Sequence, residues 1–213
     1  MDAILHEISQ ALQEGDHEAV SSLTQGAIDK KVPVKDILDH GLIAGMDIIG
    51  EQFSRHEIFL PEVLLAAKAM YAGMDVLKPL LVEEDIPTLG KIVIGTVHGD
   101  LHDIGKNLVG IMLRGAGFEV IDLGRDVPAE KFVEIAIQEG AGIIGMSALL
   151  TTTAPVMQKV TELLKERELS GKIKTIIGGA PVTEKFAQEI GADAYAYDAA
   201  KAVVTVKRMV PAS

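Results

Sequence analysis

The residue types best suited to chemistry lie in one short segment, Gly99-Asp100-Leu101-His102-Asp103-Ile104-Gly105. The segment follows an apolar run over residues 91–97, which is typical of a buried strand, and it precedes a helical pattern. In an open α/β sheet, ligands bind where the strands end, so this predicted loop faces a ligand-binding edge. There His102 can present one ring nitrogen to a ligand while Asp100 holds the other. Because a metal-bound imidazole needs such an acceptor, the sequence predicts that His102 is a metal ligand.

Two further predicted strands end in polar or very small residues. The segment Ser147-Ala148-Leu149 follows a second apolar run, and 41 residues separate it from Gly105. The pair Gly178-Gly179 ends a third run, with 28 residues between it and Leu149. Parallel strands end at one edge of their sheet, so we expect these two segments and the Asp100–His102 loop to form one site.

This three-part pattern, Asp-x-His-x-x-Gly, then Ser-x-Leu, then Gly-Gly, resembles the cobalamin-binding fingerprint of corrinoid-dependent methyltransferases and mutases. The resemblance implies that a corrinoid, such as cobalamin or methylcobalamin, binds with His102 as the lower axial ligand of cobalt. The cofactor's own base is then displaced into a pocket around Ser147 and Gly178. In the family, the carboxylate matching Asp100 tunes the imidazole, and the matching serine bonds toward that aspartate or lines the channel for the nucleotide tail. The resemblance assigns to the cofactor site Asp100, His102, Asp103, Ile104, Gly105, Ser147, Leu149, Thr151, Gly178 and Gly179, and it gives Asp100, His102 and Ser147 direct roles in the reaction.

Some of these positions also have simpler interpretations. Asp103 is better placed than Asp100 to cap the following helix, which leaves Asp100 to the imidazole. Gly105 is expected to let the chain turn sharply beside the tail. The pair Gly178-Gly179 is expected to leave room for that tail, although a plain turn at a strand end is the commonest use of such a pair.

Hydroxyl and imidazole groups near the predicted pocket leave other assignments open. Thr151 follows Ser147 by four residues, and the resemblance places a hydroxyl near the pocket at this position. The adjacent Thr152 and Thr153 keep that assignment open. His98 also neighbours the site, and we favour an ordinary strand-end histidine without a ligand role.

The composition excludes several classes of protein and site. The chain has 213 residues, 48% of them hydrophobic, which is enough for two small domains with cores of their own. A net charge of −11 argues against a nucleic-acid partner, because a phosphate-binding face must be basic. The absence of cysteine excludes disulfides, thiolate nucleophiles and iron–sulfur clusters. The acidic start is unlike a signal peptide and no apolar run suits a membrane helix, so we expect a cytoplasmic protein without a membrane partner.

Two kinds of periodicity divide the chain. Residues 1–84 place apolar positions at helical spacing in four stretches and predict an all-α four-helix bundle, with Asp16 as a cap. Its third helix, residues 34–53, contains glycines that we expect to permit close helix contact. Residues 85–90 are acidic and contain a proline, which indicates a linker and a hinge. Residues 91–213 alternate five Val/Ile-rich strand patterns with helical patterns, which predicts an α/β domain with a doubly wound, flavodoxin-like parallel sheet.

A second resemblance lies in the segment Phe53-Ser-Arg-His-Glu-Ile-Phe-Leu-Pro-Glu-Val63. It looks like the cap of cobalamin-dependent methionine synthase and of the small corrinoid proteins, in which a helical bundle lies over the upper face of the corrin. Position by position, Phe53, Leu60 and Val63 match the apolar residues that shield the methyl–cobalt bond. Ordinary bundle core is the simpler interpretation of all three. His56 stands where the family segment often has glycine, so we expect a difference in the local turn or in the environment above the cobalt.

Together the two resemblances imply a corrinoid methyl carrier that is not catalytic alone. Such a carrier takes a methyl group from a substrate-specific methyltransferase, gives it to an acceptor methyltransferase and needs a reductive activation protein. A cobalamin-dependent sensor or regulatory module, a mutase subunit and a flavodoxin-like phosphate-binding domain are the alternatives. The sensor would need room for an effector module, and the mutase subunits lack the cap segment.

Overall fold

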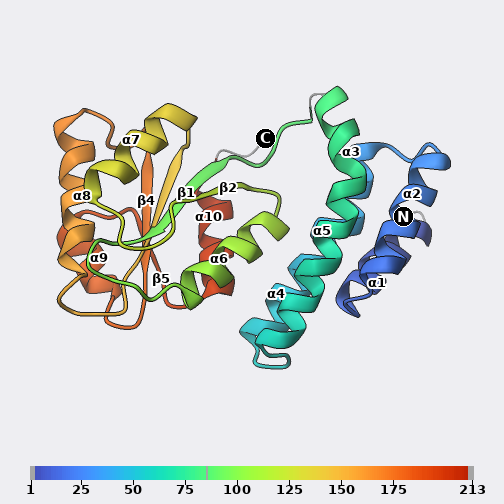
Figure 1. Ribbon diagram of the computed structural model, residues 1–213, viewed down its shortest axis with the longest axis horizontal. Helices are drawn as coiled ribbons and strands as arrows, with labels where there is room; N and C mark the ends of the chain where they lie inside the picture. Colours follow the sequence, from blue (N-terminus) through green and yellow to red (C-terminus); the bar gives the residue numbers. More distant parts are fainter. Residues whose placement is uncertain (1–2, 85, 211–213) are drawn as a thin grey trace. The chain divides into compact units, whose positions relative to one another are not determined.

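The structure, a computed structural model, describes residues 3–84 and 86–210, and its chain divides into two compact units (Figure 1). One unit contains the chain up to Pro87 together with Gly115–Gly117, and the other contains Thr88–Arg114 and the chain from Phe118 onward. The predicted linker, residues 85–90, includes Asp85, which lies outside the described residues. The linker and the exact domain boundaries stay predictions.

The first unit is helical, as the sequence predicts. It contains α1 (Ala3–Gln13), α2 (His17–Asp29), α3 (Val34–Asp36), η1 (Ile37–Ile43), α4 (Ala44–Ser54) and α5 (Leu60–Glu83). The segments α3, η1 and α4 are consecutive and form the single third helix of the prediction, with η1 as a π-helical stretch inside it. The Asp16 side chain accepts a hydrogen bond from the N–H of Ala19 (3.0 Å) and caps α2 as expected. No helix in the described part of the chain combines the length and the apolar character of a membrane span.

Glycines let the third helix pack closely on α1. A Cβ atom at Gly41 would lie 3.1 Å from Cγ2 of Ile8, and one at Gly45 would lie 3.1 Å from Cδ2 of Leu12. Both distances are shorter than an ordinary van der Waals contact, so side chains at these positions would push the two helices apart. The expected role of these glycines is confirmed.

The second unit alternates strands and helices. It contains β1 (Lys91–Thr96), α6 (Ile104–Gly115), β2 (Glu119–Asp122), α7 (Ala129–Glu139), β3 (Ile143–Ser147), α8 (Pro155–Glu166), β4 (Lys174–Gly178), α9 (Glu184–Ile190), β5 (Ala194–Ala196) and α10 (Ala199–Met209). The strands pair in parallel in the order β2-β1-β3-β4-β5. This is the flavodoxin-like order, and it confirms the predicted fold class.

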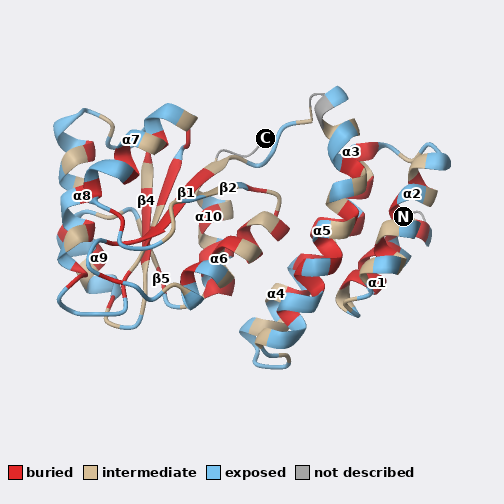
Figure 2. Cartoon of the chain, in the orientation of Figure 1, coloured by how far each residue is buried: buried red, intermediate tan, exposed pale blue. Residues whose placement is uncertain are grey.

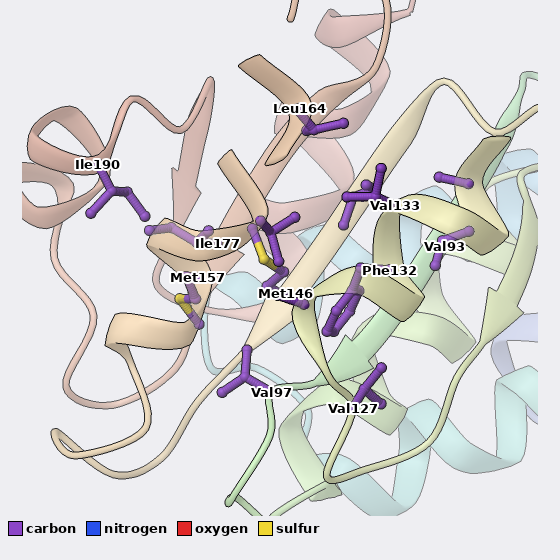
Figure 3. Close-up of a cluster of buried hydrophobic side chains, with 14 of the residues drawn as sticks. Val93, Val97, Val127, Phe132, Val133, Met146, Met157, Leu164, Ile177 and Ile190 are labelled. Carbon is purple, nitrogen blue, oxygen red and sulfur yellow. The ribbon is translucent and has the colours of Figure 1, made fainter. Parts of the chain in front are cut away.

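Helices cover both faces of this sheet (Figure 1). The helices α7, α8 and α9 contribute to one apolar core, which includes Val93, Phe132, Met146, Met157 and Ile177 (Figure 3). On the other face, α10 contacts β4 and β5, and α6 approaches β1 so closely that a Cβ at Gly110 would lie 2.8 Å from Cδ1 of Ile94. Buried residues accordingly concentrate in the strands and on the inner sides of the helices (Figure 2). A sheet buried on both faces gives a rigid support for the loops at its ends.

The three strand ends singled out in the sequence lie side by side. Thr96 at the end of β1 is in register with Ser147 at the end of β3, and Ser147 is in register with Gly178 at the end of β4. The N–H of Val97 donates to the carbonyl oxygen of Ser147 (3.0 Å), which extends the pairing into the loops. The expected common edge is therefore present.

Close backbone packing explains the glycine pair at this edge. A Cβ at Gly178 would lie 2.7 Å from the carbonyl oxygen of Ala196. Gly179 has a φ of +123°, and a Cβ there would overlap the carbonyl oxygen of Ala148. Both positions therefore require glycine even without a ligand, which agrees with the simpler interpretation of this pair.

We predict that Gly179→Ala destabilises the protein more than a matched substitution at Gly140. Gly140 also has a positive φ, +65°, but no atom lies within 4 Å of an added Cβ. Gly140→Ala should therefore cost only the left-handed backbone penalty of about 1 kcal/mol. Gly179→Ala should cost about 1–3 kcal/mol more, because its methyl group meets backbone that cannot move aside. Urea unfolding of the two variants measures the difference, and equal losses would contradict the packing argument.

Candidate functional site

The carboxylate of Asp100 is the centre of the site. Its side chain is fully buried, with 0% of its surface exposed. Oδ2 accepts hydrogen bonds from the N–H groups of Leu149 (2.7 Å) and Leu150 (3.1 Å) and from the hydroxyl of Thr153 (2.9 Å). Oδ1 accepts one from the N–H of His102 (3.1 Å). One carboxylate thus joins the β1–α6 loop to the loop between β3 and α8.

These bonds decide the charge of Asp100. Burial alone raises the pKa of a carboxyl group, because it removes water from the charged form. Here the N–H groups of Leu149 and His102, together with the side chains of His102 and Thr153, outweigh burial and hold the pKa of Asp100 well below its ordinary value. The group is therefore an anion at neutral pH.

The ring of His102 is held from one side and open on the other. Nδ1 lies 2.8 Å from Oδ1 of Asp100, while 54% of the side chain is exposed. Since the carboxylate can only accept, we assign the proton to Nδ1, which leaves the lone pair on Nε2. The hydroxyl of Thr96 donates to the carbonyl oxygen of His102 (2.9 Å) and fixes the backbone beneath the ring. The arrangement orients the imidazole and leaves Nε2 accessible, which is what a metal ligand requires.

Large apolar side chains are exposed on the same two loops. Leu101 and Ile104, on either side of His102, expose 62% and 76% of their surface, and Leu149 and Leu150 are also exposed. Apolar groups left in water around a polar centre are typical of a ligand-binding surface. Nothing lies within 4 Å of a Cβ built on Gly105, so the surface is open there as well. Leu101 and Leu150 were missed by the sequence analysis, and only their exposure identifies them.

The structure shows which hydrogen bonds are made at three predicted positions. Asp103 precedes α6, but its carbonyl oxygen rather than its carboxylate accepts the N–H of Asn107 (2.8 Å). The hydroxyl of Ser147 has no hydrogen-bond partner among the described residues, and Thr153 instead bonds to Asp100. Thr151 is exposed, so the hydroxyl that reaches the centre is the third of the threonine run and not the first. A direct contact of Ser147 or Thr151 with a ligand stays a prediction.

The predicted cap residues belong to the helical unit. Val63 is fully buried in it, which agrees with the simpler interpretation as bundle core, whereas Phe53 and Leu60 are partly exposed. His56 has a φ of +59°, the left-handed conformation that glycine adopts freely. His56 therefore adopts a conformation that glycine could also take, and the expected difference in the local turn or in the environment above the cobalt stays a prediction.

An ion pair between a buried lysine and a partly exposed aspartate adjoins the His102 loop. Lys106, in the first turn of α6, is only 4% exposed, and its Nζ lies 2.7 and 2.6 Å from the two carboxylate oxygens of Asp122 at the end of β2. Nζ also donates to Oδ1 of Asn107 (2.6 Å). The pair anchors the start of α6 to the sheet. A lysine directly after Gly105 at a helix start was the available sequence signal, and it was missed.

A metal bound at His102 must bring most of its ligands with it. Across the described ranges, no group of three or more His, Asp or Glu side chains is arranged to hold a metal ion. A corrinoid would bring most of the metal's ligands itself, and His102 would supply one further nitrogen. The residues present therefore fit a corrinoid: one free imidazole nitrogen, apolar side chains beside it and open space at Gly105.

We predict that Asp100→Asn lowers the free energy of unfolding by about 3 kcal/mol at neutral pH, because the amide replaces one acceptor oxygen with an NH2 group that faces N–H or O–H donors. Since the folded pKa of Asp100 is lowered, its contribution is complete above the ordinary value of about 3.9 and declines as the pH falls below it. The difference in the free energy of unfolding between wild type and Asp100→Asn should therefore become smaller in acid. Urea unfolding between about pH 5 and pH 3 tests this. Asp103→Asn is the matched control. A difference in unfolding free energy between wild type and Asp100→Asn that stays constant with pH would contradict the lowered pKa of Asp100.

Comparison with known proteins identifies the family of the chain. A family model described as a B12 binding domain matches residues 90–206, and a second model with the same description matches residues 4–78. Dimethylamine corrinoid protein 1 of Methanosarcina acetivorans is 46% identical over 210 residues, which cover 98% of this chain and 98% of that protein.

Solved structures agree as well. A cobalamin-binding protein of Desulfitobacterium hafniense superposes with a TM-score of 0.82 at 35% identity, covering 99% of this chain and 100% of that chain. The methanol:cobalamin methyltransferase complex of Methanosarcina barkeri gives a TM-score of 0.86 at 33% identity, covering 98% of this chain and 80% of the matched chain. The chain therefore belongs to the B12-binding corrinoid proteins of methyltransferase systems.

Proposed function

We propose that the protein carries a methyl group on a corrinoid whose lower axial ligand is Nε2 of His102. The carrier receives the methyl group from a substrate-specific methyltransferase and delivers it to an acceptor methyltransferase. The observation that supports this most directly is the half-exposed imidazole of His102, bonded through Nδ1 to a buried and fully hydrogen-bonded carboxylate. Such an acceptor sets the tautomer, the orientation and the donor strength of a ligating histidine.

The chain's own residues supply binding and control. A bound corrinoid supplies a cobalt centre that can take up and release a methyl group. Leu101 and Ile104 offer apolar contact to the underside of its ring, and the detached base is proposed to enter the pocket near Ser147 and Gly178. Through its bond to Nδ1, the anionic Asp100 would tune the donor strength of the His102 imidazole that would hold the metal.

The helical unit is proposed to act as the cap. Phe53 and Leu60, which are partly exposed, would exclude water and radicals from the upper face, and Val63 would support them from the core. Because a partner enzyme must reach the same face, the cap has to move, and residues 85–90 are the proposed hinge.

Three partners follow from this proposal. The M. barkeri relative was solved in a methanol:cobalamin methyltransferase complex, which supports a substrate-specific methyltransferase as the first partner here. An acceptor methyltransferase is required because the transferred group must leave the carrier. The sequence contains no cysteine, so the chain has no thiol redox centre of its own, and a separate reductive activation protein is the third partner.

We predict that His102→Ala changes the absorption spectrum of the cobalamin-loaded protein. The wild type should show the free base of the cofactor and a histidine ligand, whereas the variant should retain the cofactor's own base on cobalt or lose the cofactor. Because loss of a partner of a ligating histidine typically weakens metal binding about 10–100-fold, loss of the histidine itself should weaken it at least as much. His40→Ala, which removes an exposed histidine of the helical unit, is the control. An unchanged spectrum in His102→Ala would rule out the ligand assignment.

We also predict that Phe53→Ala speeds the light-induced loss of the methyl group from protein loaded with methylcobalamin. The smaller side chain would admit water and oxygen to the upper face. Phe186→Ala in α9 of the other unit is a control for general loosening. The decay of the methylcobalamin absorption under constant light gives the rate, and an unaltered rate in Phe53→Ala would remove the shielding role.

A further inference from the structure

A second histidine–carboxylate pair adjoins the first. Nδ1 of His98 lies 2.7 Å from Oδ1 of Asp126, in the loop between β2 and α7. The same oxygen accepts the N–H of Gly99 (2.7 Å). In addition, the N–H of Asp126 donates to the carbonyl oxygen of Asp100 (3.1 Å). One residue therefore contacts three consecutive residues of the β1–α6 loop.

The backbone of Asp126 adopts an uncommon conformation to make these bonds. Its φ is +57°, a left-handed value that non-glycine residues seldom take, although Asp and Asn tolerate it best. The next residue, Val127, donates its N–H to the carbonyl oxygen of Thr96 (3.0 Å) and is bridged to Val97. The left-handed turn thus directs both the N–H and the carboxylate of Asp126 onto the neighbouring loop. An uncommon backbone conformation that is held in place by its surroundings is typical of functional loops.

The bonds of Asp126 complete the fixation of the His102 loop. From one side, the loop is held by Thr96, and from a second side by the partners of the Asp100 carboxylate. The peptide segment from His98 to Asp100 turns through a φ of +83° at Gly99, and the N–H of Asp100 donates to the carbonyl oxygen of Val97 (3.1 Å). Asp126 restrains that peptide at the N–H of Gly99 and at the carbonyl of Asp100. The N–H of Gly99 also lowers the pKa of Asp126, against the opposing effect of burial, and keeps it a good acceptor.

We propose that Asp126 is a positioning residue for His102: its carboxylate holds the N–H of Gly99, its N–H holds the carbonyl oxygen of Asp100, and these two bonds orient the imidazole. His98 in turn orients the Asp126 carboxylate. The proposal rests on the function proposed above, because the orientation of the imidazole affects cofactor binding only if His102 is the ligand. It gives a role to a residue pair that the sequence analysis had treated as an ordinary strand-end histidine and an unremarked aspartate.

Substitutions at Asp126 separate its carboxylate from its backbone. Asp126→Gly keeps the N–H and takes a positive φ freely, but it removes the carboxylate. Asp126→Asn keeps an oxygen acceptor for the N–H of Gly99 and tolerates the same φ. We expect Asp126→Gly to bind cobalamin about tenfold more weakly, with a smaller histidine-ligated fraction in its absorption spectrum, and Asp126→Asn to restore most of both. If Asp126→Gly matches the wild type, the proposal is wrong.

A measurement on the cofactor-free protein tests whether Asp126 orients the imidazole of His102. Ring nitrogen shifts in ¹⁵N-labelled cofactor-free protein report which nitrogen of His102 carries the proton. The wild type and Asp126→Asn should show a proton on Nδ1, and Asp126→Gly should show averaging between the two nitrogens. Failure of the wild type to bind through His102 would count against the proposed function, whereas unchanged His102 shifts in Asp126→Gly would count against this inference alone.

His98→Ala is the matched control for the pair. It removes one partner of Asp126 but leaves the bonds to Gly99 and Asp100, so cobalamin affinity should fall by less than in Asp126→Gly. A loss as large as that of Asp126→Gly would assign the positioning to the imidazole and overturn the role given to the carboxylate. Urea midpoints of all variants check that each is folded. Should Asp126→Gly unfold, the comparison of Asp126→Asn with Asp126→Ser gives the same test.

Discussion

The site depends on one buried anion, the carboxylate of Asp100. A charge without exposed surface is tolerated only when hydrogen bonds replace the water that it has lost. Two N–H groups and a hydroxyl from the β3–α8 loop meet one of its oxygens, and two donors of His102 meet the other. The same bonds that keep the carboxylate ionised also fix the ring of His102. The charge of Asp100 and the orientation of the His102 imidazole therefore depend on the same set of hydrogen bonds.

The parallel sheet makes this convergence possible. Because β1 and β3 are neighbours in register, the loops that follow them leave the sheet at the same height. The loop after β2 reaches the same region from the other side of β1, which brings Asp126 to Gly99. A ligand-binding edge at the carboxyl ends of the strands is the general property of such sheets, and here it assembles residues from three separate loops.

Local patterns in the sequence were sufficient for the fold and for the central pair. Apolar runs marked the strands, and the two-residue spacing of Asp100 and His102 on a strand-to-helix loop predicted their contact. Spacing could not choose among three adjacent threonines, because only the path of the β3–α8 loop turns Thr153 inward. Asp126 gave no signal, since its role depends on a left-handed backbone and on contacts with a loop distant in sequence. Likewise, the exposure of Leu101 is a property of the folded surface and not of the apolar pattern.

The most direct test concerns the proposed bond between Nε2 of His102 and cobalt. The protein is produced with ¹⁵N-labelled histidine, loaded with unlabelled cob(II)alamin and studied by electron paramagnetic resonance. If Nε2 of His102 is the axial ligand, each hyperfine line splits into a doublet, and the labelled His102→Ala variant lacks that doublet. A triplet, which arises from the ¹⁴N of the cofactor's own base, would contradict the central claim.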